Sequence, residues 1–323
     1  MTTKRSGDTP FQFIHRKDLH VLPGDAMDSE VNLHGGFATD LRANFGHLYY
    51  GMPEYGILRI DPDLKKQELI QLPDRLKPMN FHSTKIGAVG GGLRLFLPAN
   101  NDGMVAVVDL EGDLDFILTR PEFEQYQADA TQVAAAPFAP TDTLLVGNQL
   151  FVADGYGANY ISSADMTSQQ WTGIFGGKTD DATTNGKFAT AHGINLHPEN
   201  HHHLMIADRP NSRIQVHGLE GDFIASHSLP PGSWPCGIDY LQWEGRWLAV
   251  IGSLVDPVKD RPAPIYIIDA NTYEVLSTIR PKEDLGLEPV QHLHNVVWHA
   301  INDQLYLVCQ SWNPGHYFVL ERV

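Results

Sequence analysis

The sequence predicts an all-β fold, a six-bladed β-propeller, and three observations support this prediction. Short β-rich runs recur between turns that are rich in glycine and proline, while helical periodicity is scarce. Similar strand pairs return at intervals of roughly 44 to 59 residues, which is the spacing of propeller blades. The 323 residues, 42% of them hydrophobic, are enough to form one large closed β domain that spans residues 1–323.

Each of the six repeats is expected to contribute antiparallel strands in a fixed order. The first strands are expected within 33–40, 81–89, 140–146, 191–197, 235–241 and 293–299. The second strands are expected within 47–53, 93–100, 150–156, 204–210, 248–254 and 305–311. The third strands follow at 55–61, 103–109, 159–165, 212–218, 263–269 and 316–322, and fourth strands at 67–73, 114–120, 171–177, 223–229 and 274–281.

The sixth repeat stops after its third strand, and the apolar segment 11–17 near the N-terminus is free to supply the fourth. Pairing the two ends of the chain in this way closes the ring and removes an exposed sheet edge. The alternative is an open β-sandwich.

Charge and composition narrow the classes of partner. The net charge of −16 disfavours binding to nucleic-acid phosphates or anionic membranes, so a small-molecule substrate is the expected partner. The polar N-terminus has no signal-peptide pattern, and two cysteines do not make a disulfide framework. We therefore expect a cytoplasmic protein; the sequence does not indicate an oligomeric state.

The starts of the first strands are predicted to form a ring around the propeller axis. In blade order this ring consists of His34, His82, Thr141, His192, Cys236 and His294. Blades two, four and six each supply a histidine, and alternate blades of six are about 120° apart. We therefore predict a divalent metal held by His82, His192 and His294, with an open position for water or substrate, as in catalytic zinc sites. Zinc is the expected metal and Fe²⁺ the alternative.

The ends of the second strands should surround this metal on the same face. The predicted substrate pocket consists of His34, Met52, Tyr55, Asn100, Thr141, Cys236 and Trp312. Tyr156 and Arg209, on neighbouring blades, are the candidate catalytic residues, because a tyrosine beside a cation and a metal can act as a base. Asp154 and Asp208 are expected to bond backbone amides at turns.

At these residues the sequence resembles the peptidyl-α-hydroxyglycine α-amidating lyase family, which has an NHL-repeat-like six-bladed propeller. The resemblance is carried by PTD at 140–142, VADGY at 152–156, His192 and ADRPNSRIQ at 207–215, with weaker likeness at FHS 81–83 and LHN 293–295. It implies zinc on the three histidines, Tyr156 as base and Arg209 as its partner. The implied reaction splits an α-hydroxy amide into an amide and glyoxylate.

The sequence departs from this family at several positions. Asn295 stands where the family has an aspartate that helps to bind a structural calcium, so calcium is in doubt. The family's blade-one arginine has no counterpart before Arg59, and its disulfide cysteines are missing. We therefore expect a metal-dependent lyase that cleaves a C–N or similar bond at a hydroxyl-bearing carbon of another small molecule. The alternatives are a metal-dependent hydrolase or oxygenase, or a non-catalytic binding propeller.

Overall fold

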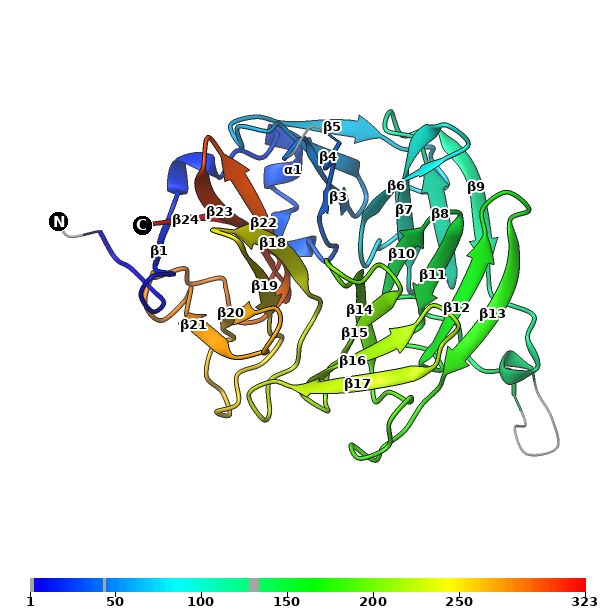
Figure 1. Ribbon diagram of the computed structural model, residues 1–323. Helices are drawn as coiled ribbons and strands as arrows, with labels where there is room; N and C mark the ends of the chain where they lie inside the picture. Colours follow the sequence, from blue (N-terminus) through cyan, green and yellow to red (C-terminus); the bar gives the residue numbers. More distant parts are fainter. Residues whose placement is uncertain (1–2, 43–44, 128–133) are drawn as a thin grey trace.

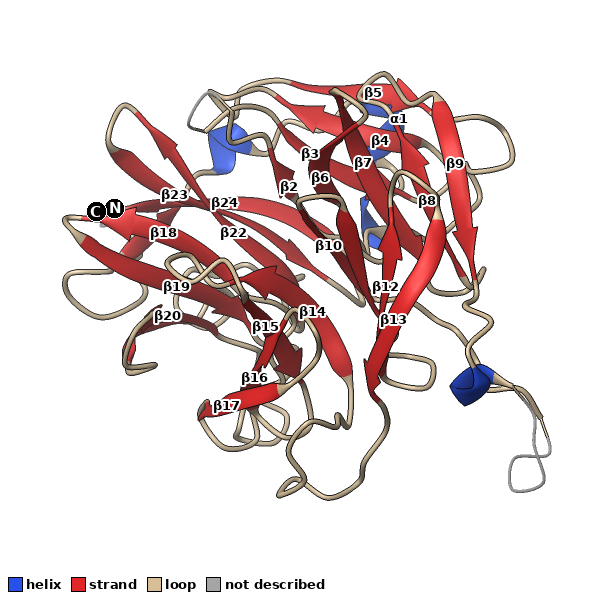
Figure 2. Ribbon diagram, turned by 45° about the vertical axis from the view of Figure 1, so that its right-hand side comes forward, coloured by secondary structure: helices blue, strands red, loops and turns tan. Residues whose placement is uncertain are grey.

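The computed structural model describes residues 3–42, 45–127 and 134–323, and it confirms the predicted six-bladed β-propeller. Six four-stranded antiparallel sheets stand around a central axis in sequence order (Figure 1). The first strand of each blade lies innermost and the fourth outermost. Figure 2 shows that helices make up only short pieces outside the sheets.

The strands coincide closely with the expected segments. Blade one contains β2 (Ala38–Thr39), β3 (Leu48–Met52), β4 (Gly56–Ile60) and β5 (Gln67–Gln71), and blade two contains β6 (Lys85–Val89), β7 (Gly92–Ala99), β8 (Met104–Val108) and β9 (Leu114–Thr119). Blade three contains β10 (Asp142–Val146), β11 (Gln149–Ala153), β12 (Tyr160–Asp165) and β13 (Gln170–Gly176), and blade four contains β14 (Ala191–Leu196), β15 (His203–Asp208), β16 (Arg213–Gly218) and β17 (Phe223–Ser228). Blade five contains β18 (Asp239–Trp243), β19 (Arg246–Gly252), β20 (Ile265–Asp269) and β21 (Val275–Ile279), and blade six contains β22 (Leu293–Ile301), β23 (Gln304–Ser311) and β24 (His316–Arg322).

The sixth blade takes its outermost strand from the N-terminus. Strand β1 (Phe13–His15) pairs antiparallel with β24, with Phe13 opposite Arg322. It is shorter than the expected segment 11–17, but the fully buried Phe13 anchors it in the core between blades five and six. The two ends of the chain therefore meet in one sheet (Figures 1 and 2).

Over the described part of the chain, the hydrophobic core is divided into six clusters, one between each pair of neighbouring blades. The cluster between blades one and two, for example, packs Ile57 and Tyr49 against Leu95 and Leu97. Each sheet is covered on both faces, so its inner strands are apolar on both sides instead of alternating with polar residues. This explains the runs of buried residues in β3, β11 and β23.

Irregular pairing at the starts of several first strands turns side chains toward the axis. In β14 the register shifts between Ala191 and Ile194, and in β22 it shifts between Leu293 and Asn295. In blade two the pairing passes from Phe81–Ala99 to Lys85–Phe96, which is four residues against three. An extra residue of this kind bends the strand and redirects a side chain. His192, His294 and His82 lie within these irregular stretches.

The remaining elements are short. The segment before blade one contains η1 (Lys17–Leu19), α1 (Gly24–Met27) and η2 (Glu30–Asn32), and η3 (Glu124–Tyr126) follows blade two. Within the described residues, no helix is long and apolar enough to cross a lipid bilayer.

Candidate metal centre

The three predicted metal ligands meet on the propeller axis. His82, His192 and His294 are 1%, 3% and 2% exposed. His192 and His294 are the second residues of β14 and β22, and His82 lies just before β6. The Nε2 atom of His82 lies 3.1 Å from that of His192 and 3.2 Å from that of His294. Blades two, four and six thus bring three imidazoles to one level, as the repeat pattern predicts.

The other ring nitrogen of each histidine faces a backbone carbonyl from the next first strand around the axis. His82 Nδ1 lies 2.7 Å from the oxygen of Thr141, His192 Nδ1 lies 2.5 Å from that of Cys236, and His294 Nδ1 lies 3.1 Å from that of Gly35. A carbonyl can only accept a hydrogen bond, so each Nδ1 must carry the proton and donate it. Each Nε2 is then left with its lone pair directed at the axis.

Close packing of the first strands makes this pattern possible. A Cβ atom added to Gly193 would lie 2.5 Å from the carbonyl oxygen of Cys236, which is too close for any side chain. Glycine directly after His192 therefore lets the neighbouring strand approach and present the carbonyl to the imidazole.

The protonation state of the three imidazoles bears on whether they fit a metal. Burial is the main cause that holds the pKa of His82, His192 and His294 well below the usual value, and the nearby Arg209 guanidinium lowers it further. The imidazoles are therefore neutral at neutral pH, and no proton is available to separate Nε2 atoms that are 3.1 Å apart. The residues present thus fit a divalent metal, because neutral imidazoles with their outer nitrogens bonded to carbonyls are typical ligands.

The spacing also suits a first-row metal. With Zn–N distances of about 2.0–2.1 Å, tetrahedral geometry places two ligand nitrogens about 3.3–3.4 Å apart. The separations of 3.1 and 3.2 Å from His82 are close to this value. His192 and His294 lie further from each other, because the group whose ligand atoms all lie within 4.8 Å of one another consists of His34, His82 and His294.

Tyr156 and Arg209 lie together beside this centre, as expected for a catalytic pair. The Tyr156 hydroxyl lies 3.3 Å from Nε2 of His192 and accepts a hydrogen bond of 2.7 Å from Nη1 of Arg209. Nη2 of Arg209 approaches the Cys236 thiol sulfur to 3.0 Å. Arg209 is only 3% exposed, whereas Tyr156 is 41% exposed and so stands between the buried histidines and solvent.

Two buried aspartates hold the loops that carry this pair. The Asp154 carboxylate accepts hydrogen bonds from the backbone N–H groups of Ala139 and Ala158, and it fixes the turn that contains Tyr156. The Asp208 carboxylate accepts from Ala189 N–H and pairs with the Arg213 guanidinium at 2.9 Å. Both therefore have the turn-bonding role that the sequence predicts.

Other residues of the predicted pocket lie in different surroundings. Met52 is packed in the core between blades one and six, and the Tyr55 hydroxyl accepts a hydrogen bond from Ser29. The Thr141 hydroxyl donates to the carbonyl oxygen of Ala191 at 2.9 Å. Thr141 therefore contacts the histidine centre through its backbone carbonyl, which faces His82, and not through its side chain.

Asn100, Cys236 and Trp312 differ in what they offer to a ligand. The Asn100 amide donates to Asn101, and its own oxygen is buried without a partner among the described residues. Cys236 is buried, which raises the pKa of its thiol, while Arg209 opposes that shift. Trp312 is 36% exposed and borders a pocket of about 360 Å³ that His34 also lines.

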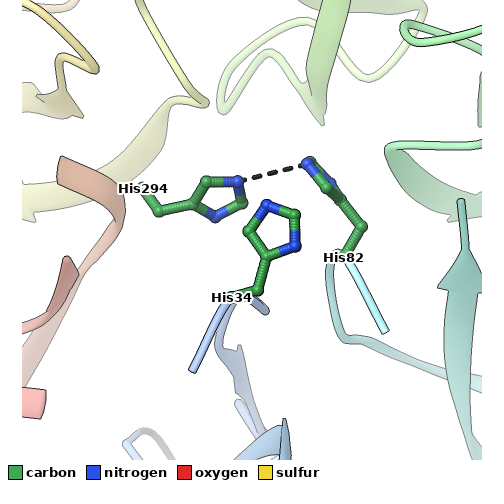
Figure 3. A group of neighbouring side chains, drawn as sticks. All are labelled: His34, His82 and His294. Carbon is green, nitrogen blue, oxygen red and sulfur yellow. Dashed lines mark hydrogen bonds between the residues drawn. The ribbon is translucent and has the colours of Figure 1, made fainter. Parts of the chain in front are cut away.

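His34 approaches the axis from blade one. Its ring centroid lies 4.6 Å from those of His82 and His294 and 5.2 Å from that of Trp312. Figure 3 shows its ring directed at the gap between His82 and His294. Burial lowers the pKa of His34 to about 4, so this fourth imidazole is also neutral at neutral pH.

The family resemblance raises the question of a structural calcium near Asn295. The residues that follow the histidines along the first strands show whether calcium fits there. The Asn295 side-chain oxygen accepts a hydrogen bond of 3.1 Å from Phe37 N–H. The Lys85 ammonium lies 3.3 Å from the Asp142 carboxylate and donates to the carbonyl of Ile194. An amide in place of a carboxylate, with a lysine close by, is a poor environment for calcium, which prefers several carboxylate oxygens.

A second histidine–carboxylate group lies away from the axis. His20, Glu30 and His316 offer ligand atoms within 4.8 Å of one another. Oε1 of Glu30 already accepts the N–H of Tyr317 at 2.7 Å and contacts both histidines, at 2.7 and 2.9 Å. We interpret this group as a hydrogen-bonded cluster that ties η2 to β24.

Side-chain patterns in the sequence do not identify the outer partners of the histidines. Asn80, whose Nδ2 lies 2.8 Å from Nδ1 of His34, precedes the first strand of blade two and has no repeat equivalent that would single it out. The partners at Gly35, Thr141 and Cys236 are backbone carbonyls, which every residue type has, so side-chain identity does not reveal them. Their common position beside the ring of first-strand starts is the one signal that points to them.

Comparison with known proteins supports the fold. No protein-family model matches the sequence, and no curated protein matches it. Among solved structures, a gluconolactonase from Xanthomonas campestris superposes with a TM-score of 0.63 at 10% identity, over 100% of this chain and 95% of that one. A streptogramin B lyase gives a TM-score of 0.53 at 10% identity over 88% and 92% of the two chains, and the β-propeller domain of Cps50 (Swd1) from Myceliophteria thermophila gives 0.54 at 10% identity over 89% and 82%.

At this level of identity the likeness concerns the fold alone. Two of these three propellers are enzymes by name, and none of them belongs by name to the amidating lyases. The comparisons thus place the chain among β-propellers.

Proposed function

We propose that this protein is a metal-dependent lyase that cleaves a C–N or similar bond at a hydroxyl-bearing carbon of a small molecule. The observation that carries the proposal is the contact between a proton acceptor and the three-histidine centre. The Tyr156 hydroxyl lies within 3.3 Å of Nε2 of His192 while Arg209 donates to it at 2.7 Å.

A divalent metal, with zinc as the expected one, would be held by His82, His192 and His294 and would supply Lewis acidity toward a substrate hydroxyl. The Arg209 guanidinium stabilises negative charge on the Tyr156 oxygen, so Tyr156 can accept the hydroxyl proton. The O–H electron pair then forms a C=O bond as the C–N bond breaks, and Tyr156 returns the proton to the departing nitrogen. The products are an amide and a carbonyl compound, and neither an oxidant nor water is consumed.

Two further features support this assignment. Arg209 is almost fully buried and already donates toward Tyr156 and Cys236, so it is placed to act as a partner of the base. The half-exposed Tyr156 is the side of the centre that a small molecule can reach from solvent.

The test is a turnover assay of purified protein on a panel of α-hydroxy amides of the carbinolamide type, in which the hydroxyl-bearing carbon is bonded to the amide nitrogen. The panel includes compounds with and without a substrate carboxylate. We expect release of amide and aldehyde by protein supplied with zinc, and no release after treatment with a chelator. Loss of turnover in His192→Ala but not in His201→Ala, an exposed loop histidine, would support the assignment. No turnover of any α-hydroxy amide by metal-loaded protein would contradict it.

A further inference from the structure

His34 is a buried histidine whose Nε2 atom, the ring nitrogen remote from the main chain, has no partner among the described residues. Its side chain is 6% exposed, and its Nε2 atom makes no hydrogen bond with any described residue. An unpaired nitrogen buried in this way destabilises the folded protein unless something binds to it. The sequence places His34 at the blade-one position of the same ring that supplies the three other imidazoles.

The direction of the ring indicates what binds. Ligand nitrogens of His34, His82 and His294 all lie within 4.8 Å of one another. In Figure 3 the nitrogen of His34 that is remote from the main chain points into the gap between the other two rings. Four imidazole nitrogens around one metal are separated by about 3–4 Å, so a shift of about an ångström or two brings His34 into contact.

The Asn80 amide is the outer hydrogen-bond partner of His34. Its Nδ2 lies 2.8 Å from Nδ1 of His34 and donates to it, while Oδ1 of Asn80 is buried without a partner among the described residues. A half-turn of this amide would place its oxygen against Nδ1 instead, and Nδ1 would then carry the proton. Nε2 of His34 would then carry a lone pair directed at the axis, as Nε2 does in His82, His192 and His294.

We propose that His34 is a fourth nitrogen ligand of the axial metal, with Asn80 as its outer hydrogen-bond partner. The inference rests on the metal site of the proposed function. His34 borders His82 and His294, whereas the Tyr156 hydroxyl contacts His192 and its ring packs on His82. No ring contact joins His34 to Tyr156 or His192 among the described residues, so a ligand from blade one leaves the Tyr156 side open to substrate. With four imidazoles bound, zinc would take a substrate oxygen as a fifth ligand, a coordination number that catalytic zinc can reach.

The test uses Co²⁺ alone, added to metal-free protein and followed by its d–d absorption. We expect one equivalent to bind to the wild type. His34→Phe keeps a ring against Trp312 but has no nitrogen, and we expect it to weaken Co²⁺ binding at least about tenfold and to strengthen the absorption as the coordination number falls. Asn80→Leu should weaken binding about tenfold through loss of the outer partner.

His217→Ala is the matched control, because His217 is also fully buried with an unpaired Nε2 but lies in β16, away from the axis. It should leave the Co²⁺ affinity and spectrum unchanged. A His34→Phe protein with wild-type affinity and spectrum, beside a His192→Ala protein that loses Co²⁺, would overturn the fourth ligand and leave the three-histidine site intact. Failure of the wild type to bind Co²⁺ would overturn both. If His34→Phe does not fold, His34→Ala answers the same question.

Discussion

Replacement of Tyr156 by phenylalanine isolates the proposed base from the metal centre. The change removes one oxygen that contacts Nη1 of Arg209 at 2.7 Å and Nε2 of His192 at 3.3 Å. A general base contributes about 10²- to 10⁴-fold to a rate, so kcat should fall by that factor. Nη1 of Arg209 loses its acceptor, and because the 41% exposure of Tyr156 lets water reach it, the free energy of unfolding should fall by only about 1 kcal/mol.

Three measurements on the same preparation separate these effects: turnover of an α-hydroxy amide, metal content by elemental analysis, and urea denaturation. Tyr160→Phe is the control, because Tyr160 lies in β12 and packs its ring against Tyr126, outside the centre. The expected outcome is a large loss of kcat with metal content and fold retained. A Tyr156→Phe protein that keeps both its metal and its full kcat would refute the assignment of the base.

Three further predictions concern the scaffold. Phe13→Ala should lower the free energy of unfolding by about 3–5 kcal/mol in urea, because Phe13 is fully buried in the strand that closes the ring; a loss below about 1 kcal/mol would mean that the closure is dispensable. Asp208→Ala should cost about 3–5 kcal/mol because it leaves the buried Arg213 guanidinium without its carboxylate, and a neutral effect in the same denaturation assay would show that the pair adds nothing. Burial raises the pKa of Cys236 and Cys309, so neither thiol should react with a thiol reagent at about pH 8 until the protein unfolds; rapid modification of native protein would contradict their buried positions.

The repeats make much of the fold predictable. The turn-strand pattern has the same order in every blade. An ambiguous strand in one repeat can therefore be assigned by comparison with the equivalent strands of the other repeats. The register of the first strands then places His82, His192 and His294 in one ring on the basis of sequence alone. The N-terminal closing strand follows from counting, since blade six has one strand too few.

The fine positions within the centre cannot be predicted in the same way. The ring assigns His34 and Thr141 to a pocket because it treats all first-strand starts alike. In the structure the extra residues at Ala191–Ile194 and Leu293–Asn295 decide which side chains reach the axis. Such irregularities depend on how adjacent strands pack, and a single sequence carries no clear sign of them.

The central claim is that the propeller axis holds a metal, and elemental analysis of purified wild-type protein beside His192→Ala tests it most directly. The three converging Nε2 atoms predict about one divalent metal per chain in the wild type and its loss from the variant. One zinc would agree with the lyase chemistry proposed above, while one iron would keep the site and redirect the search to oxygenase reactions. A wild-type protein that binds no metal even when zinc is supplied would contradict the account.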